Sequence, residues 1–259
     1  MKACNLLALS AFVGAALASP IEQEAELAKR AGDTTTVNLN QCSGSPQLFG
    51  QGVLYGMSGT GAPLQQYITE LKVNYESNGG AQSDASPAGY ATSINSYNYR
   101  FQQVLNAYKR IRANNGVLIV KMADLWGADE TTNNSFKFPG DNGDWTTYDN
   151  FINQMISDLK ANGMANSYST QLELWNEPDI NFGGRPQSQF NAMFVRGTKA
   201  LRAAFPKGGA FLPLVGPSSA TPPANGQGFW QSFLGYLQSN GGQAYQPDVW
   251  NWHMEGGGE

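Results

Sequence analysis

A short run near the middle of the chain combines a carboxylic acid with an amide, an indole and a proline. The run is Trp175-Asn176-Glu177-Pro178, and it ends the apolar segment 171–175, which has the length of a buried strand. We expect Pro178 to disfavour helical geometry at Glu177 and to hold it extended where the strand ends. Partial burial beside Trp175 is expected to raise the pKa of Glu177, which would keep its carboxyl protonated as a general acid. Asn176 would supply a neutral hydrogen-bond donor beside that acid.

The composition of the 259-residue chain restricts the other chemistry that is available. The chain has one histidine, His253, and two cysteines, Cys4 and Cys42, so a Cys/His zinc cluster or a Ser-His-Asp triad would have to use His253. It has 16 Lys and Arg residues against 20 Asp and Glu, a formal net charge of −4, and no basic tract. A nucleic-acid-binding surface is therefore not expected. Carboxylate chemistry remains, without a metal or cofactor.

The first 30 residues predict targeting and processing segments. Residues 1–18 have a lysine, a short apolar run and a small-x-small end, which is the pattern of a signal peptide. The apolar run is too short to remain as a membrane-spanning helix. Residues 19–30 resemble a fungal-type propeptide that ends at the dibasic pair Lys29-Arg30. The mature protein is therefore expected to begin near Ala31 and to be secreted and extracellular.

Short apolar segments alternate with amphipathic segments along residues 31–259. The segments that predict buried strands are 52–57, 117–122, 171–175, 212–215 and 249–253, with a weaker one within 73–82. Those with apolar residues at helical spacing are 101–111, 148–159, 190–201 and 229–237, with a weaker one at 63–71. Strands that alternate with helices indicate βαβ units and a parallel sheet.

Two α/β architectures have this alternation, the closed (β/α)8 TIM barrel and the open doubly wound sheet. A doubly wound dinucleotide-binding domain needs a Gly-x-Gly-x-x-Gly turn after its first strand, whereas the glycines here are at 56, 59 and 61. We therefore expect the barrel. About six of its eight units can be recognised, so residues 31–259 are expected to be a C-terminally incomplete barrel domain.

The Trp175-Asn176-Glu177-Pro178 run resembles the acid/base motif at the end of the fourth strand in clan A glycoside hydrolases. These are retaining enzymes with a (β/α)8 barrel. From about residue 50 to residue 259 the sequence is similar to fungal family 39-type members, whose activities include β-xylosidase. The resemblance implies a retaining O-glycosidase that acts on oligo- or polysaccharides. It implies that Glu177 is the general acid/base, that Asn176 contacts the 2-hydroxyl of the substrate, and that His253 lies near the nucleophile.

The same resemblance leaves the nucleophile unassigned. In this clan the nucleophile is a glutamate at the end of the seventh strand, and the sequence up to Glu259 predicts six strands. Glu255 follows the sixth predicted strand and is expected to be a substrate ligand or a loop carboxylate. Residues 31–259 alone are therefore expected to give little or no turnover. The alternatives are a catalytically inactive carbohydrate-binding fragment and an endo-glycanase on the same barrel.

Three further residues at predicted strand ends are candidates for substrate binding, namely Trp175, Asp124 and Trp126. For Asp124 and Trp126 a loop carboxylate and an indole that covers the core are equally good interpretations. His253 has the alternative of an ordinary hydrogen-bonded polar residue at a strand end. Glu173 alternates onto the same side as Trp175, so we expect it to be buried and paired rather than catalytic.

Overall fold

The computed structural model describes residues 51–58, 61–81, 88–128, 136–224 and 228–254. The chain divides into two compact units, Met1–Gln47 and Leu48–Glu259, and every described residue belongs to the second unit. The predicted signal peptide and propeptide, and Glu255, lie outside the described residues.

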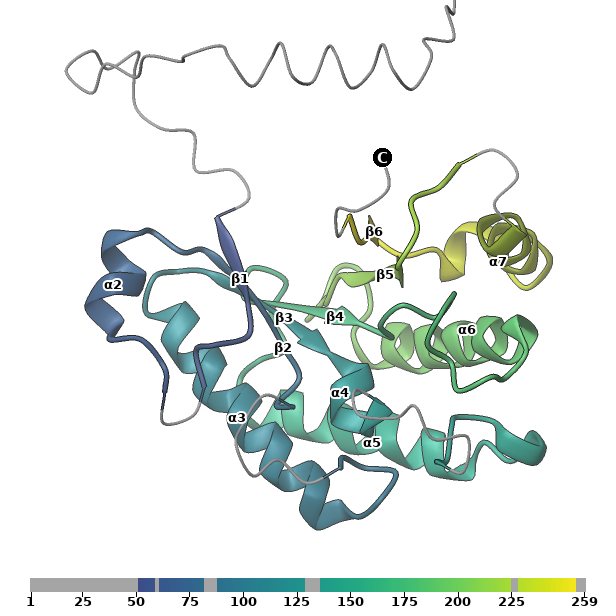
Figure 1. Cartoon of the computed structure of the whole chain (residues 1–259), viewed down its shortest axis with the longest axis horizontal. Helices are drawn as coiled ribbons and strands as arrows, with labels where there is room; N and C mark the ends of the chain where they lie inside the picture. Colours follow the sequence, from purple (N-terminus) through teal and green to yellow (C-terminus); the bar gives the residue numbers. More distant parts are fainter. Residues whose placement is uncertain (1–50, 59–60, 82–87, 129–135, 225–227, 255–259) are drawn as a thin grey trace, which may run out of the picture. The chain divides into compact units, whose positions relative to one another are not determined.

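Within the described residues, six strands form one sheet in which all neighbouring pairs are parallel and the spatial order follows the chain order (Figure 1). They are β1 (Gly52–Leu54), β2 (Tyr75–Asn78), β3 (Val117–Lys121), β4 (Thr170–Glu173), β5 (Leu214–Ser219) and β6 (Val249–Trp252). A doubly wound sheet reverses its strand order at a switch point, whereas a (β/α)8 barrel keeps the chain order throughout. The fold is therefore α/β and forms about six units of a (β/α)8 barrel, which confirms the prediction.

Helices connect the strands, and Figure 1 shows the longer ones along one side of the sheet. They are α2 (Gln65–Glu70), α3 (Ile94–Arg112), α4 (Met122–Trp126), α5 (Thr146–Ala161), α6 (Gln187–Ala204) and α7 (Gly228–Ser239), with short 3-10 turns at Asp141–Gly143 and Gly242–Tyr245. The predicted helical segments all fall within these helices or overlap them. Across the described ranges, none of the helices combines the length and the apolar character that a membrane span requires.

Helix α3 illustrates how the local sequence defines these elements. The side chain of Ser93 caps its first turn by accepting a hydrogen bond from Ser96 N at 3.1 Å, which satisfies one of the unpaired amides at the helix start. Lys109, Arg110 and Arg112 lie in the last turn, where positive charge is favourable next to the helix dipole. The helix then contacts β2 and β3, so its apolar face covers the sheet.

Alternation along the strands separates the helix-covered face of the sheet from the face that carries polar groups. Leu118, Val120 and Leu172 are completely buried in the core. Lys121 and Glu173, which follow Val120 and Leu172, turn to the opposite face and line a pocket. The register of β3 and β4 pairs Lys121 directly with Glu173, so the two charges lie side by side.

Several strand boundaries differ from those that the apolar pattern predicted. Strand β1 ends at Leu54 and β4 at Glu173, before the predicted ends at 57 and 175. The segment 117–122 was expected to be a strand throughout, but helix α4 begins at Met122, directly after the last residue of β3. The strand predicted at 212–215 begins at Leu214 and extends to Ser219, because residues up to Ser219 pair with β6. Gly, Pro and Ser in this extension contribute no apolar signal, so the sequence pattern ends too early.

Both edge strands of the described sheet carry exposed apolar side chains, as expected where the described strands do not close into a barrel. Leu54 at the end of β1 is 62% exposed, and Met254 just after β6 is 76% exposed. Val53, Trp250 and Trp252 on the same two strands are also exposed. Further strands would cover such side chains in a closed barrel.

Glu76 is a carboxylic acid in the interior, on the face of β2 opposite to Ser77. The residue is completely buried, and Asn78 Nδ2 donates a hydrogen bond to its Oε1 at 2.8 Å. Burial raises the pKa of Glu76 to about 7, although hydrogen bonds from Asn78 and Met57 and the charge of Arg110 oppose the shift. The folded protein therefore holds Glu76 as a neutral acid at mildly acidic pH.

The free energy of unfolding should consequently fall as the pH rises through Glu76 ionisation. A carboxyl whose pKa is raised on folding contributes its full stability below the unfolded value of 4.5, and that contribution is lost as the pH rises through about 7. The loss is on the order of 3 kcal/mol. Urea denaturation at about pH 4.5 and pH 8 should show it in the wild type and much less of it in Glu76→Gln. The same pH dependence in both proteins would contradict this origin.

Candidate active site

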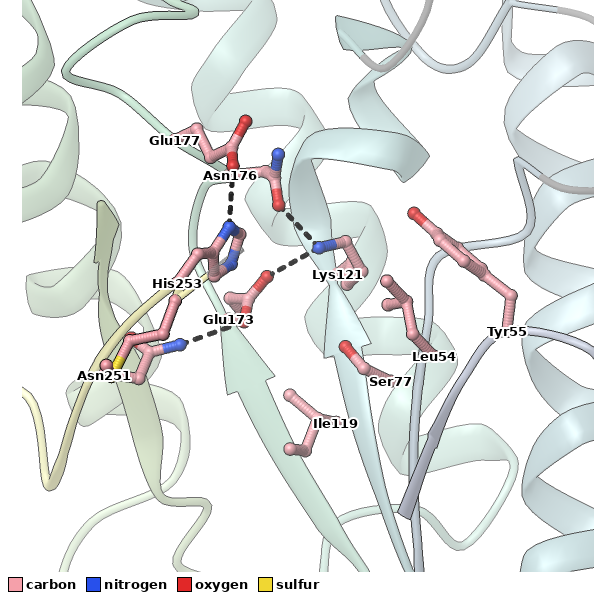
Figure 2. A pocket seen from close by; sticks show the side chains of 11 residues that line it. Leu54, Tyr55, Ser77, Ile119, Lys121, Glu173, Asn176, Glu177, Asn251 and His253 are labelled. Atoms are coloured by element: carbon pink, nitrogen blue, oxygen red, sulfur yellow. Dashed lines mark hydrogen bonds and ion pairs between the residues drawn. The ribbon is translucent and has the colours of Figure 1, made fainter. Parts of the chain in front are cut away.

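A pocket of about 480 Å³ opens at the carboxyl ends of the strands (Figure 2). Residues of β1, β2, β3, β4 and β6 and of the segments that follow β1, β4 and β6 contribute to it. The lining residues are Leu54, Tyr55, Ser77, Ile119, Lys121, Glu173, Asn176, Glu177, Asn251, His253 and Met254. Parallel strands place their carboxyl ends at one edge of a sheet, which is where (β/α)8 barrels carry their catalytic groups. Three of the predicted site residues, Asn176, Glu177 and His253, are brought together here.

Glu177 has a left-handed backbone conformation, with φ of 48°, and not the extended one that Pro178 was expected to impose. This conformation is uncommon for a residue with a side chain. It allows Glu177 N to donate a hydrogen bond to Ser218 O at 2.7 Å, which joins the segment after β4 to the end of β5. Ser218 also has a positive φ, of 56°. Strained backbone conformations cluster at functional sites, and of these two hydrogen-bonded residues Glu177 lines the pocket.

His253 holds the carboxylate of Glu177 from the neighbouring side of the pocket. The Nδ1 atom of His253 lies 2.8 Å from Glu177 Oε1, and the two side chains are 23% and 19% exposed. The backbone N of His253 donates to Ser219 O at 2.8 Å, so the imidazole is anchored at the end of β5. The pair therefore combines a fixed geometry with access to solvent.

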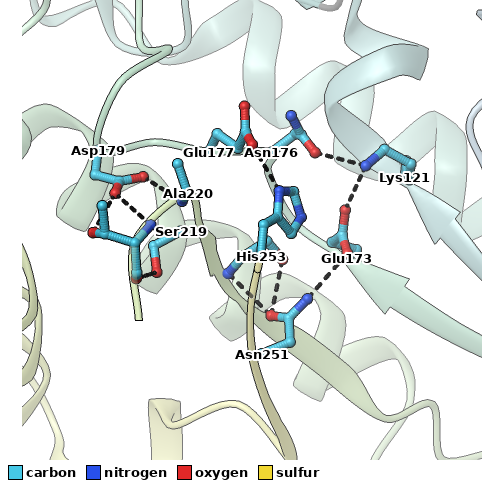
Figure 3. A network of polar contacts seen from close by, with 11 residues as sticks. Lys121, Glu173, Asn176, Glu177, Asp179, Ser219, Ala220, Asn251 and His253 are labelled. Carbon is cyan, nitrogen blue, oxygen red and sulfur yellow. Dashed lines mark hydrogen bonds and ion pairs between the residues drawn. The ribbon is translucent and has the colours of Figure 1, made fainter. Parts of the chain in front are cut away.

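Asp179 fixes the segment that carries Glu177. Its carboxylate accepts hydrogen bonds from the backbone N atoms of Ala220 and Thr221, at 2.8 and 3.1 Å, and from Thr221 Oγ1 at 2.8 Å. These contacts tie the segment after β4 to the segment after β5 (Figure 3). Glu177 is thus held between two points of attachment, its own backbone N and the side chain of Asp179.

Lys121 connects the pocket floor to Asn176. Its Nζ lies 3.0 Å from Glu173 Oε1 and 2.6 Å from Asn176 Oδ1, and the side chains of Lys121 and Glu173 are only 5% and 6% exposed. Burial by itself lowers the pKa of Lys121, but the carboxylates of Glu173, Asp124 and Glu177 together raise it above its ordinary value. Lys121 is therefore a permanent cation, and Glu173 is buried and paired, as predicted.

Asn251 continues the polar network to β5 and β6 (Figure 3). Its Nδ2 donates to Glu173 Oε2 at 3.2 Å. Its Oδ1 accepts hydrogen bonds from Ser218 N at 3.0 Å and from Ser218 Oγ at 2.9 Å. Both carboxylate oxygens of Glu173 therefore have partners, and its orientation is fixed.

The two tryptophans proposed as substrate contacts, Trp175 and Trp126, lie in the aromatic core and do not line the pocket. Trp175 packs against Phe138 and Phe182, at ring-centroid distances of 5.9 and 5.1 Å. It does not lie on the same face as Glu173, because β4 ends at Glu173 and the strand alternation does not continue to Trp175. The expectation that the Trp175 indole lies beside the carboxyl of Glu177 and desolvates it is therefore wrong.

Trp126 is completely buried, and its Nε1 donates to the backbone O of Lys137 at 2.9 Å. Asp124, on the same short helix α4, is 2% exposed and accepts a hydrogen bond from Tyr55 OH at 2.6 Å. Tyr55 lines the pocket and Asp124 does not, so Asp124 is linked to the site indirectly, by its hydrogen bond with the Tyr55 hydroxyl. For Trp126 the core interpretation agrees with the structure.

Sequence reasoning did not identify Lys121, Asn251 or Tyr55 as site residues. Lys121 carried a detectable signal, because it is a charged residue at the carboxyl end of an otherwise apolar strand. Asn251 lies between two tryptophans, and its contact with Glu173 depends on sheet register alone. Within the described ranges, no group of three or more His, Cys, Asp and Glu side chains has the arrangement of a metal site.

Comparisons with known proteins relate the chain to solved structures. No protein-family model and no curated protein matches it. The structure of N2152 from Neocallimastix frontalis is similar with a TM-score of 0.52 and 20% identity, over 78% of this chain and 43% of that chain. A glucosidase from Croceicoccus marinus gives 0.49 and 14%, with the same coverage. A glycoside hydrolase family 30 subfamily 8 xylanase from Clostridium acetobutylicum gives 0.39 and 14%, over 64% and 42%. The chain spans less than half the length of these structures.

Proposed function

We propose that this chain is the acid/base half of a retaining O-glycosidase, with Glu177 as the general acid/base. The observation that carries the proposal is the contact between Glu177 Oε1 and His253 Nδ1 at 2.8 Å, inside a pocket at the carboxyl ends of the barrel strands. A carboxyl group that is fixed by a neighbour yet reachable from solvent can protonate a leaving oxygen. The resemblance of the sequence around Glu177 to the clan A motif supports the same role.

In the first step, Glu177 would donate its proton to the glycosidic oxygen as the bond to the sugar ring breaks. In the second step, the resulting carboxylate would remove a proton from the attacking water. His253 would hold one carboxylate oxygen throughout and leave the other free to face the substrate. Asn176 would bind a hydroxyl group of the sugar, in a contact that strengthens as positive charge develops on the ring.

A retaining mechanism also needs a second carboxylate about 5–5.5 Å from the first, as nucleophile. The described carboxylates that line the pocket are Glu173 and Glu177. Both oxygens of Glu173 are occupied, by Lys121 and by Asn251, so this residue supports the site and is a poor nucleophile. We therefore propose that the nucleophile comes from outside the described residues, and Glu255 remains a proposed substrate ligand.

The proposal predicts glycoside hydrolysis with retention of configuration by the protein expressed from its complete gene. Aryl β-xylosides, β-glucosides and α-L-arabinosides form a suitable panel, and proton NMR early in the reaction identifies the first anomer released. Retention follows from two successive displacements at the anomeric carbon. Release of the inverted anomer would exclude the double-displacement mechanism, and no turnover on glycosides of any kind would exclude the proposed function.

We also propose that the protein is secreted and matured by cleavage after Arg30. The proposal is supported by the signal-peptide pattern of residues 1–18 and by the dibasic pair that closes residues 19–30. Protein recovered from the medium of a fungal expression host should have Ala31 as its N-terminal residue by Edman degradation. Retention of the protein inside the cell with Met1 in place would contradict both steps.

A further inference from the structure

The hydrogen bonds around Glu173 have a direction that is fixed at every step. They begin at Ser218, whose backbone N and Oγ both lie next to the Oδ1 atom of Asn251. A backbone N–H can only donate, so this atom of Asn251 must be the oxygen and its Nδ2 must face Glu173. Figure 3 shows the continuous network from Asn251 through Glu173 and Lys121 to Asn176.

The same reasoning fixes the carboxamide of Asn176. An ammonium group has only donors, so the Asn176 atom 2.6 Å from Lys121 Nζ must be its oxygen. The Nδ2 atom then points away from Lys121, as Figure 2 shows. Among the described residues, none accepts a hydrogen bond from Asn176 Nδ2. Its two N–H groups are therefore the ones that Asn176 offers to a molecule in the pocket.

We propose that Lys121 is a positioning residue, which fixes the carboxamide of Asn176 so that the pocket presents a hydrogen-bond donor and selects an acceptor oxygen at this place. This deepens the proposed function and rests on it for the identity of the ligand, a saccharide whose hydroxyl oxygen accepts from Asn176 Nδ2. A neutral amide that is free to rotate would present its oxygen as readily as its nitrogen. Lys121 removes that ambiguity through a charge-assisted hydrogen bond.

The burial of the Lys121–Glu173 pair determines which variants are informative. Lys121→Met alone would leave the carboxylate of Glu173 without its cation. Lys121→Met/Glu173→Gln removes the donor to Asn176 without leaving an unpaired buried charge. Glu173→Gln alone also breaks the ion pair, but the carboxylates of Asp124 and Glu177 still compensate the charge of Lys121. It keeps Lys121 next to Asn176 and is the matched comparison. Lys109→Met, at an exposed position on α3, controls for the loss of a lysine.

The test is the order parameter of the Asn176 side-chain amide, measured by ¹⁵N relaxation, with the signal assigned by its absence in Asn176→Asp. In the wild type, in Lys109→Met and in Glu173→Gln we expect a value of about 0.85, as for a rigid backbone. In Lys121→Met/Glu173→Gln we expect less than about 0.6. A rigid amide in the double variant would overturn the proposal. A mobile amide in the wild type would overturn it without any variant.

A second measurement separates this inference from the proposed function. Methyl β-D-xyloside and methyl β-D-glucoside are titrated into the same proteins. We expect the Asn176 amide signal to move on binding, and binding to the double variant to be about tenfold weaker than to Glu173→Gln. Binding that leaves the Asn176 signal in place would overturn the donor contact. If neither glycoside binds the wild type, the proposed function fails for these sugars, while the relaxation data still decide the role of Lys121.

Discussion

Replacement of Glu177 by glutamine should reduce hydrolysis of glycosides with poor leaving groups by about 10²–10⁴-fold, the usual contribution of general acid catalysis. Glutamine keeps the size of the side chain and can still contact His253, but it has no proton to give to the leaving oxygen. The glycosylation step of aryl glycosides with good leaving groups should be much less affected, because those groups depart without protonation. Steady-state and burst kinetics of the protein expressed from its complete gene distinguish the two effects.

The matched control is Glu70→Gln, the same substitution at an exposed position on α2. It should leave both classes of substrate unaffected. Equal losses of the glycosylation rate for good and poor leaving groups in Glu177→Gln would show that Glu177 is not the proton donor. In that case its contact with His253 would have only a structural role.

The second large effect is expected on stability, in Lys121→Met. The side chains of Lys121 and Glu173 are almost completely buried, and removal of one partner from a buried ion pair costs about 3–5 kcal/mol, because the other charge remains without compensation. Guanidinium denaturation should show this decrease in the free energy of unfolding for Lys121→Met. Lys109→Met, at an exposed position, should change it by less than about 0.5 kcal/mol.

The double variant Lys121→Met/Glu173→Gln should regain a large part of that loss, because no unpaired charge remains in the interior. The difference between the single and double variants measures the cost of the isolated carboxylate. Losses that simply add in the double variant would mean that the two side chains do not interact as an ion pair in the folded protein.

The sequence by itself determined the fold class and the place of Glu177 at a strand end. The spacing of apolar residues within a segment depends on which of its side chains are buried, so strands and helices can be predicted from that segment alone. Examples are the apolar runs at 117–122 and 171–175 and the helical spacing at 148–159. Because parallel strands end at a common edge, the alternation of strands and helices was enough to place Glu177 and His253 at the same end of the sheet. Their proximity was therefore predictable, although their contact was not.

The tertiary structure alone decided how the side chains at that edge meet. Lys121, Glu173 and Asn251 come from three strands, and their network depends on strand register, which pairs residues 52 positions apart in the chain at Lys121 and Glu173. The left-handed conformation of Glu177 arises together with its hydrogen bond to Ser218, a contact that the residues around Glu177 do not encode. Trp175 was misplaced for a related reason. Strand alternation predicts the direction of a side chain only while the strand continues, and β4 ends two residues before this indole.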